Sequence, residues 1–502
     1  MGGRIAALGR SHELIAAIGG NGRAVELRGA TVLPGFVDPH LHLLEAASLE
    51  AKLDLRGLKR LRQVLSALEA YASQLPRGTW VRAFGLDEAL LEERRGPTRA
   101  ELDAAVPDKP LRLRHQTLHA SWLNSCAIER LGLDDPSIPL PTGACVFRDH
   151  HGRATGLVVG LEKWISQRIP KVSADELEWR AKAFSKRLAE VGVTAIADAG
   201  AHNGLDEVRL FARLVKQGII RQRVSLMLGA DYVEQAPEAA KVAAESGLRL
   251  DWVKFMPTSD TQPQRWASVL RRVRALGLGA AFHVTELEEM EAVLTTIELA
   301  RTEASIRQNG LASLRLEHAS LVAPNYLRRI ARSGAWIVAN PGFLYYRGAK
   351  YRQEPGLLPY LFPLKTLSNE GIPIAAASDC PVIPSNPLVG IASACLRETQ
   401  DGEPVSYDQR LSVREAYSLF TEQAAKVLGI EAGIIASGKL ADLVVFSKDP
   451  TLLSPKELLK LKPEMTIIGG DLVYQRESRG KPSSVKEVNE PGKTWCVGHR
   501  DN

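Results

Sequence analysis

The feature that most constrains the fold of this chain is an alternation of short apolar runs with helix-like stretches from about residue 175 onward. The helix-like stretches, such as 176–191 and 266–276, carry apolar residues at helical spacing. Between them lie seven runs with strand composition: Val193–Ala197, Arg223–Leu228, Trp252–Met256, Ala280–His283, Leu314–His318, Ala335–Ala339 and Ile372–Ala377. Connections of this length are typical of parallel strands joined by right-handed crossovers.

An eighth strand precedes this series and completes the fold prediction. The run Val32–Val37 contains Val and Phe, has strand composition, and leads into His40 and His42. Eight strand–helix units close into a barrel with the helices outside. The sequence therefore predicts an α/β protein built on a (β/α)8 TIM barrel.

Two further parts of the chain do not follow the barrel pattern. Short strands expected at Arg4–Leu8 and Ala24–Leu27 are too few to bury a core, and strand-like runs near the other end of the chain offer them a partner. We therefore expect a small β domain built from both chain ends, and a long insertion after the first barrel strand whose loops lie over the active site. The predicted boundaries are 1–35 and 431–480 for the small β domain, 36–430 for the barrel, 45–165 for the insertion within it, and 481–502 for a C-terminal tail.

The composition is that of an ordinary globular protein and argues against several classes of function. The chain has 502 residues, of which 45% are apolar and 24% charged, and its net charge of +6 comes without a long run of one sign. Nucleic-acid binding is therefore not expected. Five cysteines without a CxxC pair argue against a disulfide framework, and no stretch is apolar enough to predict a membrane span. We expect a cytoplasmic protein that acts on a small molecule, and a homo-oligomer is compatible with the sequence.

Several predicted strands carry or end in a side chain capable of chemistry. His40 and His42 are two residues apart, so in a strand they point to the same face and can aim two imidazoles at one metal ion. Each such residue alone is explained as an ordinary polar group at a strand end. A barrel, however, brings the ends of its strands together, so their joint occurrence favours a metal site. The later strands contribute Lys254, His283, His318, Asn340 and Asp379.

These motifs resemble those of the metal-dependent amidohydrolase superfamily. The similarity lies in Leu33–His42, in Glu317-His318-Ala319, in Ser378-Asp379 and in Gly438–Phe446, the last resembling the strand that completes the small β domain of these enzymes. Two motifs of the insertion, Pro97–Asp103 and His119–Ser125, are similar to amidohydrolase family 3, a branch that includes N-substituted formamide deformylases. The resemblance covers nearly the whole chain and does not specify the substrate.

The resemblance implies a site for one or two divalent metal ions, of which zinc suits the imidazole ligands best. His40, His42 and Asp379 would bind one ion, and His283 and His318 the other. Lys254 would bridge them after reacting with CO2 to form a carbamate, because an ammonium has no lone pair. Asp379 would also act as the general acid and base. We assign substrate contacts to three further residues, His119, Asn340 and Tyr345, although a structural hydrogen bond explains His119 equally well and a rim loop without such a role explains Tyr345.

The implied function is hydrolysis of a C–N bond in a small amide, formamide or cyclic amide by a metal-activated hydroxide. Two alternatives stay open at this point. The same metals could support ester or lactone hydrolysis or a deamination, since the ligands alone do not separate these reactions. A metal-free scaffold protein on the same fold is disfavoured, because none of the six ligand positions is lost.

Overall fold

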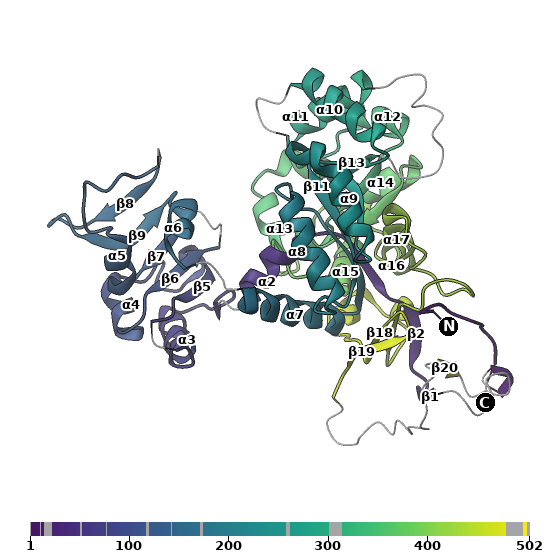
Figure 1. Cartoon of the computed structure of the whole chain (residues 1–502), viewed down its shortest axis with the longest axis horizontal. Helices are drawn as coiled ribbons and strands as arrows, with labels where there is room; N and C mark the ends of the chain where they lie inside the picture. Colours follow the sequence, from purple (N-terminus) through teal and green to yellow (C-terminus); the bar gives the residue numbers. More distant parts are fainter. Residues whose placement is uncertain are drawn as a thin grey trace. The chain divides into compact units, whose positions relative to one another are not determined.

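A computed structural model describes residues 2–10, 12–14, 23–50, 53–76, 78–116, 120–141, 143–170, 174–257, 262–300, 314–477 and 495–498 (Figure 1). The chain forms two compact units. One consists of Met1–Leu43 and Phe184–Asn502, and the other of Leu44–Ala183.

The first unit is built around eight parallel strands, which confirms the predicted (β/α)8 barrel. Each strand is hydrogen-bonded to the next in chain order, with β3 and β16 at the two ends of the order. The strands are β3 Phe36–Leu41, β10 Val193–Asp198, β11 Arg223–Gly229, β12 Arg249–Phe255, β13 Gly279–Val284, β14 Leu314–His318, β15 Trp336–Ala339 and β16 Ile374–Ala376.

The seam between the first and last barrel strands is closed just beyond the end of β16. The backbone N–H of Asp379 donates to the carbonyl of His40 at 2.8 Å, and the N–H of His42 donates to the carbonyl of Cys380 at 2.7 Å. These bonds fix the backbone of two predicted ligands, His40 and His42, against that of a third, Asp379. The barrel is therefore joined to itself at its predicted active site.

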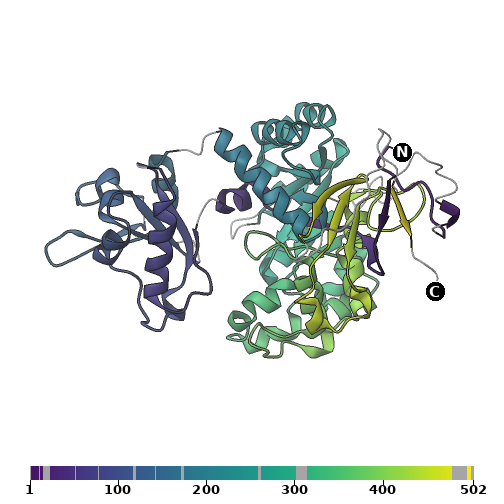
Figure 2. The same ribbon diagram turned by 90° about the horizontal axis from the view of Figure 1, so that it is seen from below.

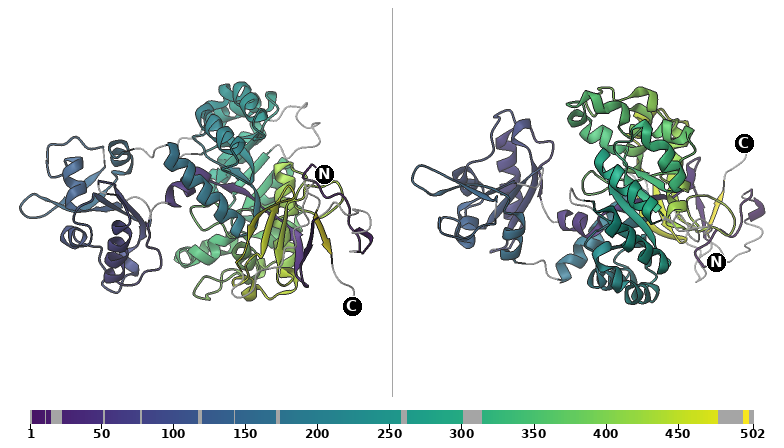
Figure 3. Two further views of the ribbon diagram at one scale, coloured as in Figure 1. Left: turned by 60° about the horizontal axis from the view of Figure 1, so that its bottom comes forward. Right: turned by 90° about the horizontal axis from the view of Figure 1, so that it is seen from above.

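Helices surround the barrel sheet, as Figures 2 and 3 show. In α8, Leu205–Lys216, the buried residues Val208, Phe211 and Ala212 form one apolar stripe at helical spacing. The crossover helices also include α9 Ala236–Ala244, α10 Pro263–Ala275, α11 Leu287–Leu299, α12 Pro324–Ser333, α13 Gly342–Tyr351 and α14 Leu364–Asn369. After the last barrel strand come α15 Pro387–Leu396, α16 Val413–Leu419 and α17 Glu422–Leu428. The helix α7, Ala174–Glu190, precedes β10.

The barrel core contains many alanines together with a few larger side chains. Its core cluster includes Ala195, Ala197, Ala281 and Ala375, together with the buried Trp252. A barrel of eight strands leaves room for side chains and little else, so this interior is a packed core. The polar side chains at the strand ends therefore rest on a rigid support.

The predicted first strand needs one correction. The run Val32–Val37 is divided between two sheets, because β2, Thr31–Pro34, pairs with the small sheet and the barrel strand β3 starts only at Phe36. Gly35 lies at the division, where an added Cβ would be 2.3 Å from Cγ2 of Thr194. Pro34 also lacks the N–H that a continued ladder would use. A glycine after a proline thus lets one run of chain leave one sheet and enter another.

The small sheet takes strands from both ends of the chain, and Figure 1 shows β2 beside β18 and β19. Its order is β19-β18-β17-β2, with β17 Leu443–Phe446, β18 Met465–Ile468 and β19 Asp471–Gln475. Of the two other expected N-terminal strands, the one at Arg4–Leu8 is not formed, and the one at Ala24–Leu27 is present but lies outside the small sheet. Arg4 forms only an isolated bridge to Leu440, and β1, Arg23–Glu26, pairs instead with β20, Trp495–Gly498, within the region predicted as a tail.

The second unit, Leu44–Ala183, has a sheet and a core of its own. Its core residues include Val64, Leu68, Val81 and Leu113. Six strands form the sheet: β4 Leu53–Asp54, β5 Val81–Leu86, β6 Leu111–His115, β7 Ala120–Leu123, β9 Ala154–Val159 and β8 Cys145–Arg148. Its helices are α3 Leu61–Ser73, α4 Arg99–Ala105, α5 Ser125–Leu131 and α6 Glu162–Arg168, while α2 Leu43–Glu50 begins at the unit boundary. That its loops lie over the active site stays a prediction. Among all the described helices, none has the length and apolar character needed to cross a membrane.

Candidate metal centre

The structure brings five of the six predicted ligands into one contiguous cluster. Nε2 of His42 lies 3.2 Å from Oδ1 of Asp379, and Nε2 of His40 lies 3.5 Å from the same oxygen. Nε2 of His318 lies 3.0 Å from Nδ1 of His283. One potential ligand atom from each of His40, His318 and Asp379 falls within 4.8 Å of the others. Residues from four different strand ends therefore meet at one point.

Two of these residues, His318 and Asp379, have a left-handed backbone conformation, which residues other than glycine rarely adopt. The φ angle is 68° at His318 and 59° at Asp379. Strand alternation would send Glu317 and His318 to opposite faces of the sheet. Instead, the carboxylate of Glu317 contacts the His40 ring, and the ring of His318 lies 4.7 Å from the same ring. The left-handed backbone of His318 thus turns its ring to the side on which Glu317 meets His40, and such strain is typical of functional sites.

Burial keeps three of the imidazoles in the neutral form that a metal requires. It lowers the pKa of His40 and of His318 well below the ordinary value. Burial, followed by the charge of Lys254, lowers the pKa of His283 to about 4. At neutral pH each of these rings therefore has one nitrogen with a free lone pair.

His42 and Asp379 form a pair at the more open side of the cluster. Burial alone would lower the pKa of His42, but its hydrogen bond to Asp379 and the charge of that carboxylate raise it. Burial opposes ionisation of Asp379, yet its contacts with His42 and His318 lower the pKa of the carboxyl group. The side chain of His42 is 25% exposed, against 1% for His40, so solvent reaches the cluster from the His42 side.

The sixth predicted ligand, Lys254, is buried at the same place. It is the next-to-last residue of β12, and its positive charge is among the causes that lower the pKa of His40 and of His283. Burial lowers the pKa of Lys254 itself to about 8. The neutral amine, which is the form that reacts with CO2, is therefore accessible near physiological pH.

The unsatisfied atoms of the cluster are those expected of a metal site. Within the part of the chain that the structure describes, neither Nε2 of His40 nor Nζ of Lys254 has a hydrogen-bond partner, although both atoms are buried. An unpartnered buried polar group costs about 1–3 kcal/mol, so such groups are rare in stable cores. Imidazole nitrogens and a carboxylate are ligands that zinc accepts. The donor set and its unused lone pair fit a divalent ion.

Of the three residues predicted to contact the substrate, Asn340 and Tyr345 lie within the described part of the chain. Asn340 is fully buried, and its side chain accepts a hydrogen bond from Nδ1 of His318 at 2.8 Å and donates to the carbonyl of Ala377 at 3.2 Å. Tyr345 lies in the helix α13, where a rim loop was predicted, with its ring 5.2 Å from that of Tyr346. His119 lies outside the described residues.

Sequence reasoning assigned no role to two charged residues beneath the cluster. Arg315 and Glu317 are fully buried on β14, and the guanidinium donates to the carboxylate at 2.7 and 3.0 Å. One oxygen of that carboxylate, Oε2, also contacts Nδ1 of His40. The sequence contained one sign of this ion pair, because two opposite charges occupy alternate positions of the strand Leu314–His318.

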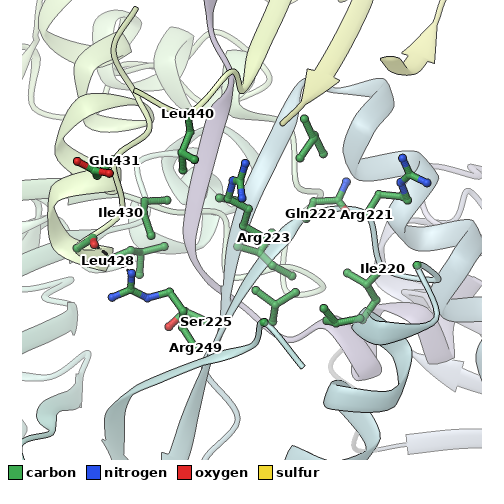
Figure 4. A pocket seen from close by; sticks show the side chains of 18 of the residues that line it. Ile220, Arg221, Gln222, Arg223, Ser225, Arg249, Leu428, Ile430, Glu431 and Leu440 are labelled. Atoms are coloured by element: carbon green, nitrogen blue, oxygen red, sulfur yellow. Dashed lines mark hydrogen bonds between the residues drawn. The ribbon is translucent and has the colours of Figure 1, made fainter. Parts of the chain in front are cut away.

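A cavity of about 460 Å³ lies at the other end of the barrel strands, and Figure 4 shows it. Arg223 and Arg249, the first residues of β11 and β12, line it together with Arg221. The labelled guanidinium groups point in different directions. Arg223 is bound through two hydrogen bonds to Asp442 at 2.6 and 3.0 Å, and Arg249 to Asp251 at 2.7 Å. The cavity therefore lacks the convergent free groups of the cluster around His40.

Comparisons with known proteins agree with this geometry. Residues 23–474 match the model of the amidohydrolase family. The chain is 27% identical over 516 residues to an N-substituted formamide deformylase of Arthrobacter pascens, covering 95% of this chain and 94% of that protein.

Two solved structures have the same fold. One, an uncharacterized metal-dependent hydrolase from Pyrococcus horikoshii OT3, matches with a TM-score of 0.70 and 21% identity over 91% of this chain and 94% of its own. Another, an uncharacterized metal-dependent hydrolase from Pyrococcus furiosus, matches with a TM-score of 0.70 and 23% identity over 90% and 94%. The family match spans the barrel, the insertion and the small sheet alike. The chain therefore belongs to the amidohydrolase family, and it is a hydrolase that acts on carbon–nitrogen bonds.

Proposed function

We propose that this protein is a metal-dependent hydrolase that cleaves the C–N bond of a small amide, formamide or cyclic amide. The observation that carries the proposal is the buried, unpartnered Nε2 of His40 beside Asp379 and His318, at the mouth of a barrel of this family. The similarity to an N-substituted formamide deformylase supports an N-formyl group among the substrates to be tested.

In this proposal, the chain supplies six ligands for one or two divalent ions, most suitably zinc. His40, His42 and Asp379 would hold one ion, and His283 and His318 the other, with a carbamate on Lys254 between them. When bound, such an ion would supply a water that ionises near neutral pH, and the ion itself would polarise the scissile carbonyl. The low pKa values of His40, His283 and His318 keep their lone pairs available for this purpose.

The protein's own residues then manage one proton. Asp379 is ionised, because its contacts with His42 and His318 lower its pKa, and it can accept the proton that the attacking water gives up. It then returns this proton to the leaving nitrogen, which departs as a neutral amine. His42 lies 3.2 Å from Asp379, so the two side chains are close enough to share one ion.

The test combines metal analysis with a substrate panel. We expect the purified protein to contain zinc or another divalent transition metal, and to hydrolyse at least one N-formyl, N-acyl or cyclic-amide compound. Removal of the ion with a chelator should abolish turnover, and added zinc should restore it. Activity confined to esters, lactones or deaminase substrates would replace the proposed reaction. Turnover that persists after complete removal of the ion would refute the metal-dependent mechanism.

We further propose that the enzyme works in the cytoplasm on a free small molecule, without nucleic acid or membrane. The absence of a CxxC pair among the five cysteines and the mixed charges support this setting. Whether the enzyme is a homo-oligomer is a separate question for a sizing measurement on the full chain.

A further inference from the structure

Beneath the cluster lies a buried ion pair that the proposed mechanism does not use. Arg315 and Glu317 have fully buried side chains, and they are joined by hydrogen bonds from Nε at 2.7 Å and from Nη2 at 3.0 Å. Nη2 of Arg315 also donates to the carbonyl of Pro39 at 2.7 Å, next to His40. The guanidinium lies 5.0 Å from the ring centre of Trp252. The backbone of Pro39 and the ring of Trp252 thus help to hold the ion pair in place.

The carboxylate of Glu317 is shared between this arginine and a predicted ligand. One oxygen, Oε2, contacts both Nη2 of Arg315 and Nδ1 of His40. An ionised carboxylate only accepts hydrogen bonds, so the nitrogen that faces it must carry the proton. A neutral imidazole has a single proton for its two ring nitrogens. That proton is therefore on Nδ1, and Nε2 keeps its lone pair.

The opposite nitrogen shows where that lone pair points. Nε2 of His40 is buried, lies 3.5 Å from Oδ1 of Asp379, and has no hydrogen-bond partner among the residues described. A proton on Nε2 would instead give that atom a donor aimed at the Asp379 carboxylate and leave Nδ1 without one for Glu317. The position of the Glu317 carboxylate therefore favours the tautomer of His40 that has its proton on Nδ1.

Stability alone gives little reason for such a pair in this place. Burying two charges is expensive, and an apolar pair of similar volume is often as stable or more so. Nη1 of Arg315 is itself a buried donor for which no described residue is a partner, so the pair is not fully satisfied. The feature that sets it apart from an ordinary ion pair is its contact with the ring of His40.

We propose that Arg315 and Glu317 are positioning residues that hold His40 in the tautomer with the proton on Nδ1 and so reserve Nε2 for a divalent ion. Arg315 holds the carboxylate, and the carboxylate holds the imidazole. The functional part of this inference depends on the proposed metal-dependent hydrolase, while the tautomer itself can be measured without any metal. Carboxylates behind a ligating histidine typically change metal affinity by about 10–100-fold when they are removed.

The most specific test replaces Glu317 with glutamine. The amide can turn its oxygen to Arg315 and its NH2 group to His40, and the imidazole then has to accept at Nδ1 and carry its proton on Nε2. For Glu317→Gln we expect the dissociation constant for zinc, measured by competition with a chelator, to rise about 10–100-fold. Glu317→Asp keeps an ionised acceptor and should recover part of the lost affinity.

The chain offers a matched control in Asp442, a second fully buried carboxylate that accepts two hydrogen bonds from an arginine, Arg223. It contacts none of the predicted ligands in the described contacts. Asp442→Asn should lower the melting temperature while changing the zinc dissociation constant less than about twofold. Equal losses of affinity in Glu317→Gln and Asp442→Asn would overturn the proposal, because both would then report only general destabilisation.

A direct measurement keeps the proposal testable even where Glu317→Gln fails to fold. In the full wild-type chain treated with a chelator, the ¹⁵N chemical shifts of labelled histidine distinguish a protonated from an unprotonated ring nitrogen, and the His40 signals are those missing in His40→Ala. We expect a protonated Nδ1 and a free Nε2. The reverse assignment would overturn the proposal. A wild-type protein with the expected tautomer but no zinc affinity would refute the proposed function and leave the tautomer inference standing.

Discussion

Both ends of the barrel contain polar and charged side chains, but the hydrogen bonding of these side chains differs between the two ends. At the carboxyl end of the strands, buried atoms of His40 and Lys254 have no hydrogen-bond partner among the described residues, and two residues have left-handed backbones. At the amino end, Arg223 and Arg249 are each bound to a carboxylate. The amino end is thus charge-compensated, as a stabilising region should be, whereas the carboxyl end keeps binding capacity unused.

This difference teaches how to recognise a site in a barrel that contains charges at both ends. A cavity of about 460 Å³ lies at the amino end, but its guanidinium groups diverge and are paired. At the carboxyl end, His40, His318 and Asp379 are buried, and their potential ligand atoms converge. Unused lone pairs are therefore a better guide to chemistry than the volume of a cavity.

The largest effect is expected from Asp379→Asn at the carboxyl end. The amide is almost isosteric but cannot take a proton from water, so turnover should fall by about 10²–10⁴-fold, the usual contribution of general acid–base catalysis. Steady-state kinetics on the best substrate measures this, and circular dichroism and metal analysis should show a folded protein that keeps most of its metal. Unchanged turnover would mean that another residue is the general base.

The reverse behaviour is expected from Arg223→Met at the amino end. Removing this arginine leaves Asp442 fully buried without its charge partner, which typically costs about 3 kcal/mol of unfolding free energy. Denaturant unfolding measures the loss, and kcat at a temperature where the variant is folded should be unchanged. A large fall in kcat would show that the two ends are coupled and would remove the contrast drawn above.

Acid should destabilise the metal-free protein through the carboxyl end. The folded-state pKa of His283 is about 4, below the unfolded value of about 6.5, so the unfolded chain binds more protons between these pH values. Unfolding free energy should therefore fall as the pH drops from about 6.5 towards 4, on the order of 1–3 kcal/mol for such a buried neutral histidine. His40 and His318 act in the same direction. In thermal melts of chelator-treated protein, His283→Asn should flatten this dependence, while a slope identical to that of the wild type would place its origin elsewhere.

The smallest effect is expected from Ser225→Ala, which sharpens the comparison. Ser225 lies at the amino end, is buried, and its hydroxyl has no partner within the described chain, like Nε2 of His40. Removing an unsatisfied hydroxyl should change the unfolding free energy by less than about 0.5 kcal/mol and leave kcat unaltered. Chemical denaturation and kinetics provide the check. A strong loss of activity would mean that an unpartnered atom at the amino end also has a function.

The repeated strand–helix units were predictable from the sequence, whereas features that depend on one long-range contact were not. Strand–helix alternation predicted seven of the eight barrel strands to within a few residues, because each has a mainly apolar run, and it placed the first strand too early. The division of the first run at Gly35 depends on the proximity of Thr194, which lies far away in the sequence. The pairing of β1 with β20 is likewise a long-range choice that composition does not encode.

The candidate site shows the same limit. His40 and His42 were predictable from their spacing, and the strand ends supplied the other ligands. The role of Asn340 was not, because a buried amide bonded to His318 and an amide aimed at a substrate have the same sequence signature. Arg315 and Glu317 were visible only as an anomaly, two charges in a buried strand, and their target His40 lies 277 residues from Glu317 in the chain.

The seam between β3 and β16 has a consequence for how an ion would act on the whole fold. His42 and Asp379 face each other across 337 residues of chain, where the barrel begins and ends. An ion held by both would be a cross-link that encloses nearly all the strands in one loop, and closing so long a loop in advance removes much of the entropy of the unfolded chain. Loading the ion would then slow the parting of the first strand from the last, so the ion would protect the molecule against unfolding as well as equip it for hydrolysis.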